Sequence, residues 1–296
     1  NPLPVANAVP MIMGANIGTT VTNTVVSLAH MGRREEFFRA FSVATCHDFF
    51  NFMTVAVLLP LEITTGYLHR AAVILASTLG GVSGVTYENP LKNALKAGLE
   101  PLKSLAGTLF EAEQAQGILL VLISALCIFG ALLLLVRVMR AATQSSIEVF
   151  INRFLGRSAL VSILLGAVLT VMVQSSSITT SLLVPLAGAG LLTLEQAFPV
   201  TIGANVGTTV TALLATLAVS GANAQAGVEI ALVHVLFNLS GIALVYPVPF
   251  IRRLPLIAAR SLARAAVESR RWALLYVLGL FYGLPAILVV LNKFFE

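Results

Sequence analysis

The sequence predicts an all-α polytopic membrane protein with inverted-topology repeats, re-entrant hairpins and broken transmembrane helices. Of the 296 residues, 57% are hydrophobic and only 10% are charged, whereas about 25% are charged in an average soluble domain. The mean hydropathy is +0.93, and several apolar stretches approach the roughly 20 residues that cross a bilayer. This composition excludes a disordered chain, a fibrous repeat and a soluble enzyme.

Charge patterning predicts how the apolar stretches are oriented. The uncharged stretches are residues 41–61, 117–136, 158–173, 228–250 and 272–291. The net charge of +5 sits mostly in arginine clusters within residues 33–39, 137–157 and 252–271, which the positive-inside rule places on the cytoplasmic side. The loop from residue 62 to residue 116 is then external, and part of it is expected to lie on the membrane surface. The charge therefore indicates topology rather than a nucleic-acid partner.

Two copies of one motif lie 189 residues apart. Residues 10–22 read PMIMGANIGTTVT and residues 199–211 read PVTIGANVGTTVT, with nine identities in thirteen positions. Further matches follow downstream: His47 with His234, Phe50 with Phe237, Asn51 with Asn238, and Pro60 with Pro247. Glycine and threonine are common in packed membrane helices, but that alone would not produce collinear matches. We interpret them as an internal repeat.

The two copies are expected to enter the membrane from opposite sides. The loop after the first motif carries three arginines, whereas residues 220–227, after the second, carry no charge. Inverted repeats with interrupted helices are typical of secondary transporters, which bind their solutes near the middle of the membrane. This pattern predicts a transporter site where the two copies meet.

The second copy predicts a re-entrant hairpin followed by a broken helix. Residues 158–173 would descend, turn at the QSSS sequence of residues 174–177, and return along residues 178–189. Residues 194–218 would then cross the membrane with a break at Gly203, Ala204 and Asn205, where protein or a water-filled cavity must satisfy the freed backbone groups. The chain starts at Asn1 within an apolar segment, and the matching hairpin of the first copy is expected about fifteen residues before Asn1.

These observations divide the chain into five parts. They are the first repeat, without its hairpin (1–62), an external loop with an amphipathic segment (63–116), a connecting transmembrane helix with a cytoplasmic amphipathic segment (117–157), the second inverted repeat (158–250), and a basic amphipathic segment with a final transmembrane helix (251–296).

The residues near the expected site are polar but almost uncharged. From residue 158 to residue 227 the only charged residue is Glu195. An anion must therefore be held by hydroxyls, amides and the backbone N–H groups of helix starts. The candidate donors are Asn16, Thr19, Thr20, Gln174, Ser175, Ser176, Ser177, Asn205, Thr208 and Thr209. Carbonyl, threonine and asparagine oxygens suit a cation such as Na⁺, which would also offset the charge of the anion.

The chain contains the QSSS sequence, the paired GANIGTT and GANVGTT segments, RREEFFRAF and ATCHDFFNFMTVAVLLPLE. Through these motifs it resembles the type II sodium-phosphate cotransporter family over almost its whole length. The resemblance implies uptake of inorganic phosphate driven by Na⁺, with Na⁺ as the only metal ion and no cofactor. The candidate phosphate-binding residues are Gln174, Ser175, Ser176, Ser177, Asn16, Thr19, Asn205 and Thr208. The candidate sodium-binding residues are Asp48, Asn23, Thr24, Asn51, Gln174, Ser175, Thr208 and Thr211.

Asp48 is the one acidic residue within a predicted span. Because a charge there costs about 2.5–3.5 kcal/mol on insertion scales, a cation partner is the expected explanation. The alternative is a hydrated position near the cytoplasmic interface. The resemblance implies that Asp48 serves one additional sodium in an electrogenic cycle, and its counterpart Val235 breaks the symmetry of the repeat. His47 and His234 favour a structural hydrogen-bonding role, whereas Asn51 and Asn238 fit either cation binding or helix bridging equally well.

The external loop lacks the cysteine pair and the glycosylation sequon of animal members of the family. We therefore expect a multi-pass protein of a bacterial inner membrane, without the loop disulfide or the tail partners of animal members. The sequence leaves the oligomeric state open. The lipid bilayer, Na⁺ and phosphate are the expected partners.

Three other functions compete with phosphate symport. A sodium-coupled carrier of dicarboxylates or another oxyanion would use the same hairpins with a larger pocket. A passive anion channel would conduct without sodium. An intramembrane serine hydrolase would use Ser176 as the nucleophile and His234 as the base, and it would need an oxyanion hole.

Overall fold

The computed structural model describes residues 5–79, 90–110, 112–141, 158–217 and 224–295, which form helices joined by short turns, with no strand among them. Helices long and apolar enough to cross a membrane are Arg34–Thr65, Leu194–Leu217, Gln225–Val245 and Arg270–Leu291. The prediction of an all-α membrane protein is confirmed. The arginines predicted to be cytoplasmic at positions 153 and 157 lie outside the described residues.

The chain forms two compact units, one from residues 1–86 with 143–296 and the other from residues 87–142. The smaller unit contains two helices that contact each other, α5 (Pro90–Leu109) and α6 (Glu113–Ala141). α5 is amphipathic, with lysines and a glutamate between apolar residues. α6 contains the apolar stretch that the sequence predicted from residue 117 to residue 136.

The first repeat forms three helices of the larger unit, α1 (Val5–Thr19), α2 (Val21–Leu28) and α3 (Arg34–Thr65). Helix α4 (Tyr67–Leu79) follows within the predicted external loop. α1 and α2 meet at Thr20, where the helix is interrupted. The long helix α3 stops at Gly66, whose φ of +63° is a conformation that glycine adopts without strain.

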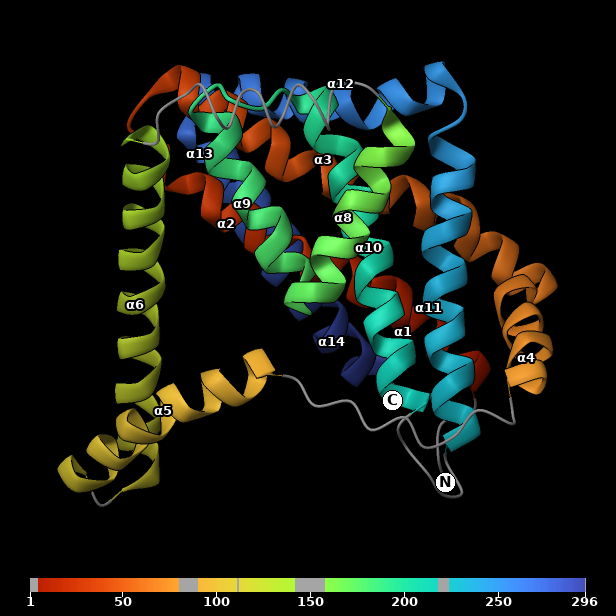
Figure 1. The fold of residues 1–296 in the computed structure, drawn as a ribbon, viewed down its shortest axis with the longest axis horizontal. Coiled ribbons are helices and arrows are strands. Elements are labelled where there is room, and N and C mark those ends of the chain that lie inside the picture. Colours follow the sequence, from red (N-terminus) through yellow and green to blue (C-terminus); the bar gives the residue numbers. More distant parts are fainter. Residues whose placement is uncertain (1–4, 80–89, 111, 142–157, 218–223, 296) are drawn as a thin grey trace. The chain divides into compact units, whose positions relative to one another are not determined.

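The second repeat forms α8 (Ala159–Val173), α9 (Ser176–Gly188), α10 (Leu194–Leu217) and α11 (Ala224–Val245). α8 and α9 form a helical hairpin that reverses at residues 174 and 175 (Figure 1). In Figure 1, α1 starts at the lower edge, near the N-terminus, whereas α10 starts at the upper edge. The hairpin packs against the first repeat, because α9 contacts both α2 and α3.

The predicted break in the second copy is wrong, because α10 is one continuous helix through Gly203, Ala204 and Asn205. The glycines instead allow close packing on α8. A Cβ atom at Gly203 would overlap the backbone oxygen of Ile163, and one at Gly207 would lie 2.5 Å from that of Ala167. Small residues of this kind bring membrane helices into contact. The sequence cannot distinguish a glycine that breaks a helix from one that packs it.

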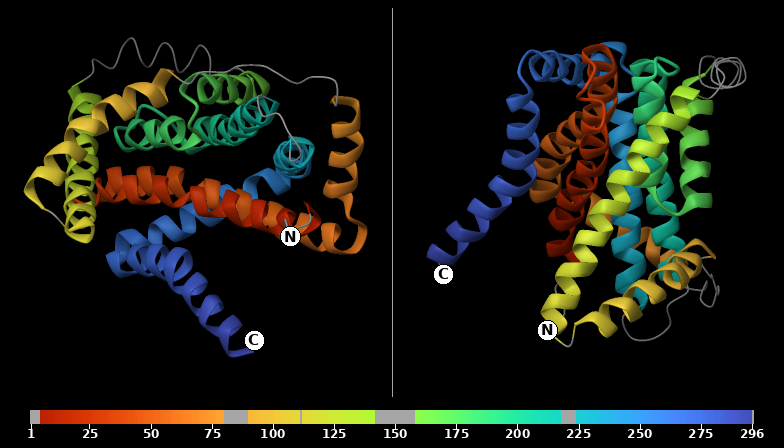
Figure 2. Two further views of the ribbon diagram at one scale, coloured as in Figure 1. Left: turned by 90° about the horizontal axis from the view of Figure 1, so that it is seen from below. Right: turned by 90° about the vertical axis from the view of Figure 1, so that its left-hand side faces the viewer.

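The C-terminal part contains α12 (Pro249–Glu268), α13 (Arg270–Leu275), a π-helical segment η1 (Tyr276–Gly283) and α14 (Leu284–Phe295). α12 crosses the ends of the other helices of this unit in Figure 1 and packs its alanine-rich face on α3. The helix before it, α11, ends at Val245, earlier than the predicted apolar stretch to residue 250. Pro247 follows, and a proline disfavours the helical conformation at the residue before it. The two further views in Figure 2 show α13, η1 and α14 leading away from α12 to the C-terminus.

Candidate functional site

Four helices of the larger unit, α1, α3, α10 and α11, meet at a centre made of amide and imidazole side chains. Each repeat contributes three of them: Asn16, His47 and Asn51 from the first, and Asn205, His234 and Asn238 from the second. We call these six residues the crossed network. All six are the residues that match between the copies in sequence, at the positions GAN and H-x-x-x-N.

The side chain of Asn16 forms its hydrogen bonds with the second repeat. Its Nδ2 donates to Oδ1 of Asn238 over 3.2 Å, and its Oδ1 lies 3.1 Å from Nε2 of His234. An amide oxygen only accepts, so the imidazole donates from Nε2. Both polar groups of this buried side chain are therefore satisfied within the protein.

Asn205, the counterpart of Asn16, makes the same bonds to the first repeat. Its Nδ2 donates to Oδ1 of Asn51 over 3.1 Å, and its Oδ1 lies 2.8 Å from Nε2 of His47. Exchanging each residue for its match in the other copy thus converts one set of bonds into the other.

A third pair of bonds reaches the helix backbone. Asn51 donates from Nδ2 to the carbonyl oxygen of Asn16 over 2.9 Å, and Asn238 donates to the carbonyl oxygen of Asn205 over 3.5 Å. Within the crossed network, Nδ1 of His47 is buried and has no hydrogen-bond partner among the described residues. A buried network of this kind fixes one arrangement of its helices, since a shift breaks its hydrogen bonds. Asn51 and Asn238 therefore bridge helices, which is one of the two roles that the sequence left open, and cation binding stays a prediction.

The turn of the α8–α9 hairpin carries the predicted QSSS residues. Gln174 adopts a left-handed conformation with φ of +59°, and the hydroxyl oxygen of Ser175 accepts a hydrogen bond from the backbone N–H of Ile178. Ser175 thereby caps the start of α9, and Ser176 is buried. Nε2 of Gln174 is buried and has no hydrogen-bond partner among the described residues, so it is available to donate to a bound group.

The predicted threonines use their hydroxyl protons within their own helices. Thr19 donates to the carbonyl oxygen of Asn16, Thr208 to that of Ala204, and Thr211 to that of Thr208. A hydroxyl whose proton is used offers only its lone pairs, which suit a cation better than an anion. Thr208 and Thr211 in this state fit sodium, whereas Thr19 and Thr208 would need to rotate to donate to phosphate.

Asp48 is fully buried in α3, not hydrated at an interface. Its Oδ2 accepts hydrogen bonds from the Thr24 hydroxyl over 3.4 Å and from the Tyr276 hydroxyl over 2.7 Å. The Thr20 hydroxyl, which donates to the carbonyl oxygen of Ile17, is a further neighbour. Oδ1 has no hydrogen-bond partner within the described part of the chain. Tyr276 was missed by sequence reasoning, because it lies outside both repeats and no motif marks it.

Asn23 joins the first repeat to the hairpin. Its Oδ1 accepts hydrogen bonds from the hydroxyls of Thr180, over 2.9 Å, and Ser181, over 3.2 Å, on α9. The structure thus brings the predicted sodium residues Asn23, Thr24 and Asp48 to the side of the hairpin. The sequence analysis missed Thr180 and Ser181, because neither residue lies in the matched motifs of the repeat.

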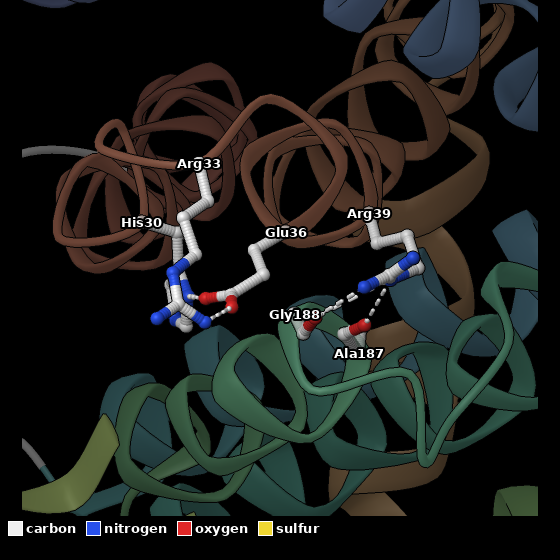
Figure 3. Close-up of polar contacts among 6 residues, drawn as sticks. All are labelled: His30, Arg33, Glu36, Arg39, Ala187 and Gly188. Atoms are coloured by element: carbon white, nitrogen blue, oxygen red, sulfur yellow. Dashed lines mark hydrogen bonds and ion pairs between the residues drawn. The ribbon is translucent and has the colours of Figure 1, made fainter. Parts of the chain in front are cut away.

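A second contact holds the far end of the hairpin (Figure 3). The guanidinium of Arg39 donates to the carbonyl oxygens of Ala187 and Gly188, at 3.1 Å and 2.9 Å, where α9 ends. His30 and Arg33 gather around Glu36 beside it. The His30 ring leaves no room for a side chain at Gly188, since a Cβ atom there would lie 2.7 Å from it. Arg39 therefore has a structural role beyond the topology signal that the sequence predicted.

Long apolar helices around a buried polar centre define a polytopic membrane protein. Residues 126–259 match the sequence model of the Na+/Pi-cotransporter family. The chain is 32% identical to sodium-dependent phosphate transport protein 2B of Pongo abelii, over 96% of this chain and 53% of that protein. It is 33% identical to transport protein 2A of Rattus norvegicus, over 96% of this chain and 55% of that protein. The chain belongs to the type II sodium-phosphate cotransporter family.

The chain spans about half the length of the curated relatives it matches. No solved structure matches it. The family consists of transporters, so the hydrolase alternative is wrong. Nε2 of the His234 imidazole is hydrogen-bonded to Asn16.

Proposed function

We propose that this chain is a secondary active transporter that couples sodium entry to the uptake of inorganic phosphate by alternating access. The crossed network carries the proposal, because two matched halves make equivalent bonds across one buried centre. Inverted-repeat transporters bind their solutes where such halves meet. The names of the relatives supply the solutes, since those proteins are sodium-dependent phosphate transporters.

Phosphate is proposed to bind at the hairpin turn. The unpartnered amide of Gln174, the hydroxyls of Ser175, Ser176 and Ser177, and the backbone N–H groups that begin α9 are neutral donors in one place, and helix starts favour anions. Thr19 and Thr208 would add hydroxyls after rotating. Asn16 and Asn205 would act by positioning their helices, since both amides are already paired in the crossed network.

Sodium is proposed to bind at carboxylate and amide oxygens and at hydroxyl oxygens whose protons are already donated within the protein. Asp48, Asn23 and Thr24 form one group next to the hairpin. The other proposed oxygen ligands are Asn51, Gln174, Ser175, Thr208 and Thr211. The cations would offset the charge of a phosphate dianion that no lysine or arginine side chain between residues 158 and 227 neutralises.

Helices α1 and α10 start at opposite edges of the view in Figure 1. This arrangement supports a further proposal, that the repeats are inverted across a lipid bilayer. The positive-inside rule then puts the arginines at the start of α3 and in α12 on the cytoplasmic side. We propose a plasma membrane location, and a bacterial inner membrane remains the prediction from the sequence.

Flux measurements test this function directly. Purified protein in liposomes should accumulate ³²P-labelled phosphate when an inward sodium gradient is imposed, and should not do so with potassium or choline at the same ionic strength. Arsenate should compete with phosphate, whereas succinate and sulfate should not. Accumulation of phosphate without sodium would indicate a channel, and preferential competition by succinate would indicate a dicarboxylate carrier. Either result contradicts the proposal.

A further inference from the structure

The final membrane helix contributes a side chain to the Asp48 group. Tyr276 starts the π-helical segment η1, 228 positions after Asp48, and its hydroxyl donates to Oδ2 of the aspartate over 2.7 Å. The helix that carries it, Arg270–Leu291, belongs to neither repeat. A residue outside the two repeats thus touches the one acidic side chain inside them.

Aromatic packing fixes the direction of this hydroxyl. The centroid of the Tyr276 ring lies 6.4 Å from that of Phe41, 6.4 Å from that of Phe49 and 5.9 Å from that of Phe281. The contacts with Phe41 and Phe281 are edge-to-face. Such contacts hold an aromatic ring in a defined orientation. The π-helical geometry begins at the same residue, and segments of this kind occur frequently at functional sites. The ring therefore aims its hydroxyl at Asp48 and is not free to turn away.

The hydrogen bonds leave the two carboxylate oxygens of Asp48 in different states. Oδ2 accepts from Tyr276 and Thr24, whereas Oδ1 is buried with no hydrogen-bond partner among the described residues. Asp48 also takes part in none of the ion pairs of the described residues. A buried carboxylate held by one oxygen and open at the other offers Oδ1 to a cation.

We propose that Tyr276 is a positioning residue for sodium, and that its hydroxyl holds the carboxylate of Asp48 so that Oδ1 faces the ion. This proposal rests on the proposed sodium-coupled function. It assigns a role in ion binding to a helix outside the repeats. Comparing the sequences of the two repeats therefore does not point to this residue. Removal of the hydroxyl alone lets the carboxylate rotate, and the site then orders only when sodium arrives.

The test uses Tyr276→Phe, which keeps the aromatic ring and removes the hydroxyl. Phosphate uptake should require about tenfold more sodium for half-saturation, the effect of losing one hydrogen bond to a charged group. At saturating sodium, the maximal rate and the half-saturating phosphate concentration should stay near wild type. Tyr282→Phe is the matched control, because Tyr282 lies on the same segment with 58% of its surface exposed. Its sodium dependence should be unchanged.

A double-variant comparison shows whether the effect passes through Asp48. In an Asp48→Asn background, Tyr276→Phe should change the sodium dependence by less than about twofold, because the two residues act as one unit. Equal tenfold shifts in both backgrounds would overturn the proposal. So would an unchanged sodium dependence in Tyr276→Phe alone.

A binding measurement separates this inference from transport itself. Sodium should raise the Tm of the purified wild type, and the rise should be smaller in Tyr276→Phe, even if that variant transports poorly. An equal rise in both proteins overturns the proposal. If the wild type accumulates no phosphate with sodium, the proposed function is contradicted. If the wild type takes up phosphate normally and Asp48→Asn changes its sodium dependence but Tyr276→Phe does not, only the positioning role of Tyr276 is contradicted.

Discussion

Matched side chains of the two repeats form equivalent hydrogen bonds in the centre of this protein. An asparagine side chain offers one accepting oxygen and one donating nitrogen. Asn16 and Asn205 use both groups on the opposite repeat, one on a histidine and one on an asparagine. Replacing either one leaves two buried polar groups without partners, so the two residues should be equivalent in their effect on stability.

Asn16→Ala and Asn205→Ala should each lower the free energy of unfolding by about 2 kcal/mol, the cost of buried polar groups left unpaired. Thermal unfolding in detergent would measure both losses. Asn7→Ala is the control, since Asn7 is an exposed amide on the same helix as Asn16, and its Tm should match wild type. A large loss for only one of the two central variants would contradict the equivalence of the halves.

Helices in this fold approach each other where glycine replaces a side chain. Gly203 and Gly14 occupy matched positions in the two motifs, yet their surroundings differ. A Cβ atom at Gly203 would overlap the backbone oxygen of Ile163, whereas nothing lies within 4 Å of one at Gly14. The matched glycines of the two motifs are therefore closely packed in α10 but not in α1.

Gly203→Ala should destabilise the protein by more than about 2 kcal/mol, because the backbone of α8 must shift to admit the methyl group. Gly14→Ala makes the same chemical change in open space and should be neutral or slightly stabilising, since alanine favours a helix. Urea or thermal unfolding of both variants provides the comparison. Equal losses would show that the glycines act through backbone conformation and not through packing.

Arg39 fastens the end of the hairpin helix α9 to the start of α3. Arg39→Ala should reduce stability by about 1–2 kcal/mol, because two helix-end carbonyls lose a charged donor. Arg34→Ala removes the same charge from an exposed residue at the start of the same helix and should have a much smaller effect. Limited proteolysis would report whether the hairpin loosens in the first variant. Equal protection of the two variants would refute the role of Arg39.

The molecule as a whole is proposed to convert ion gradients into phosphate accumulation. A tenfold sodium gradient is worth about 1.4 kcal/mol per ion, and moving one net charge across about 100 mV adds about 2.3 kcal/mol. An additional sodium at Asp48 would therefore contribute about 3.7 kcal/mol per cycle, which is several hundredfold in accumulation.

Asp48→Gly should abolish the transport current while phosphate uptake driven by the sodium gradient continues. Simultaneous measurement of current and ³²P uptake in the reconstituted protein gives the charge moved per phosphate, and imposed membrane potential should no longer change the uptake rate. A current that stays equal to that of wild type would show that Asp48 does not serve an additional ion.

Some properties of the molecule follow from local sequence. Hydropathy and charge are sums over neighbouring residues, so they predicted the helical membrane class and the apolar stretches. The repeat located Asn16, Asn51, Asn205 and Asn238, because equivalent positions keep equivalent residues. The turn at Gln174 was also predicted, since three consecutive hydroxyls point in different directions around a helix and one neighbouring helix cannot satisfy them all.

Other properties required the tertiary structure, because they depend on which helices become neighbours. Pairing across the repeats, rather than within each one, made Asn51 and Asn238 helix bridges. Close packing on α8 kept α10 unbroken, where the glycines alone were compatible with a break. Tyr276 reaches Asp48 only because a helix outside the repeats packs beside α3. Local sequence determined which groups are polar and buried, whereas folding determined which of those groups meet.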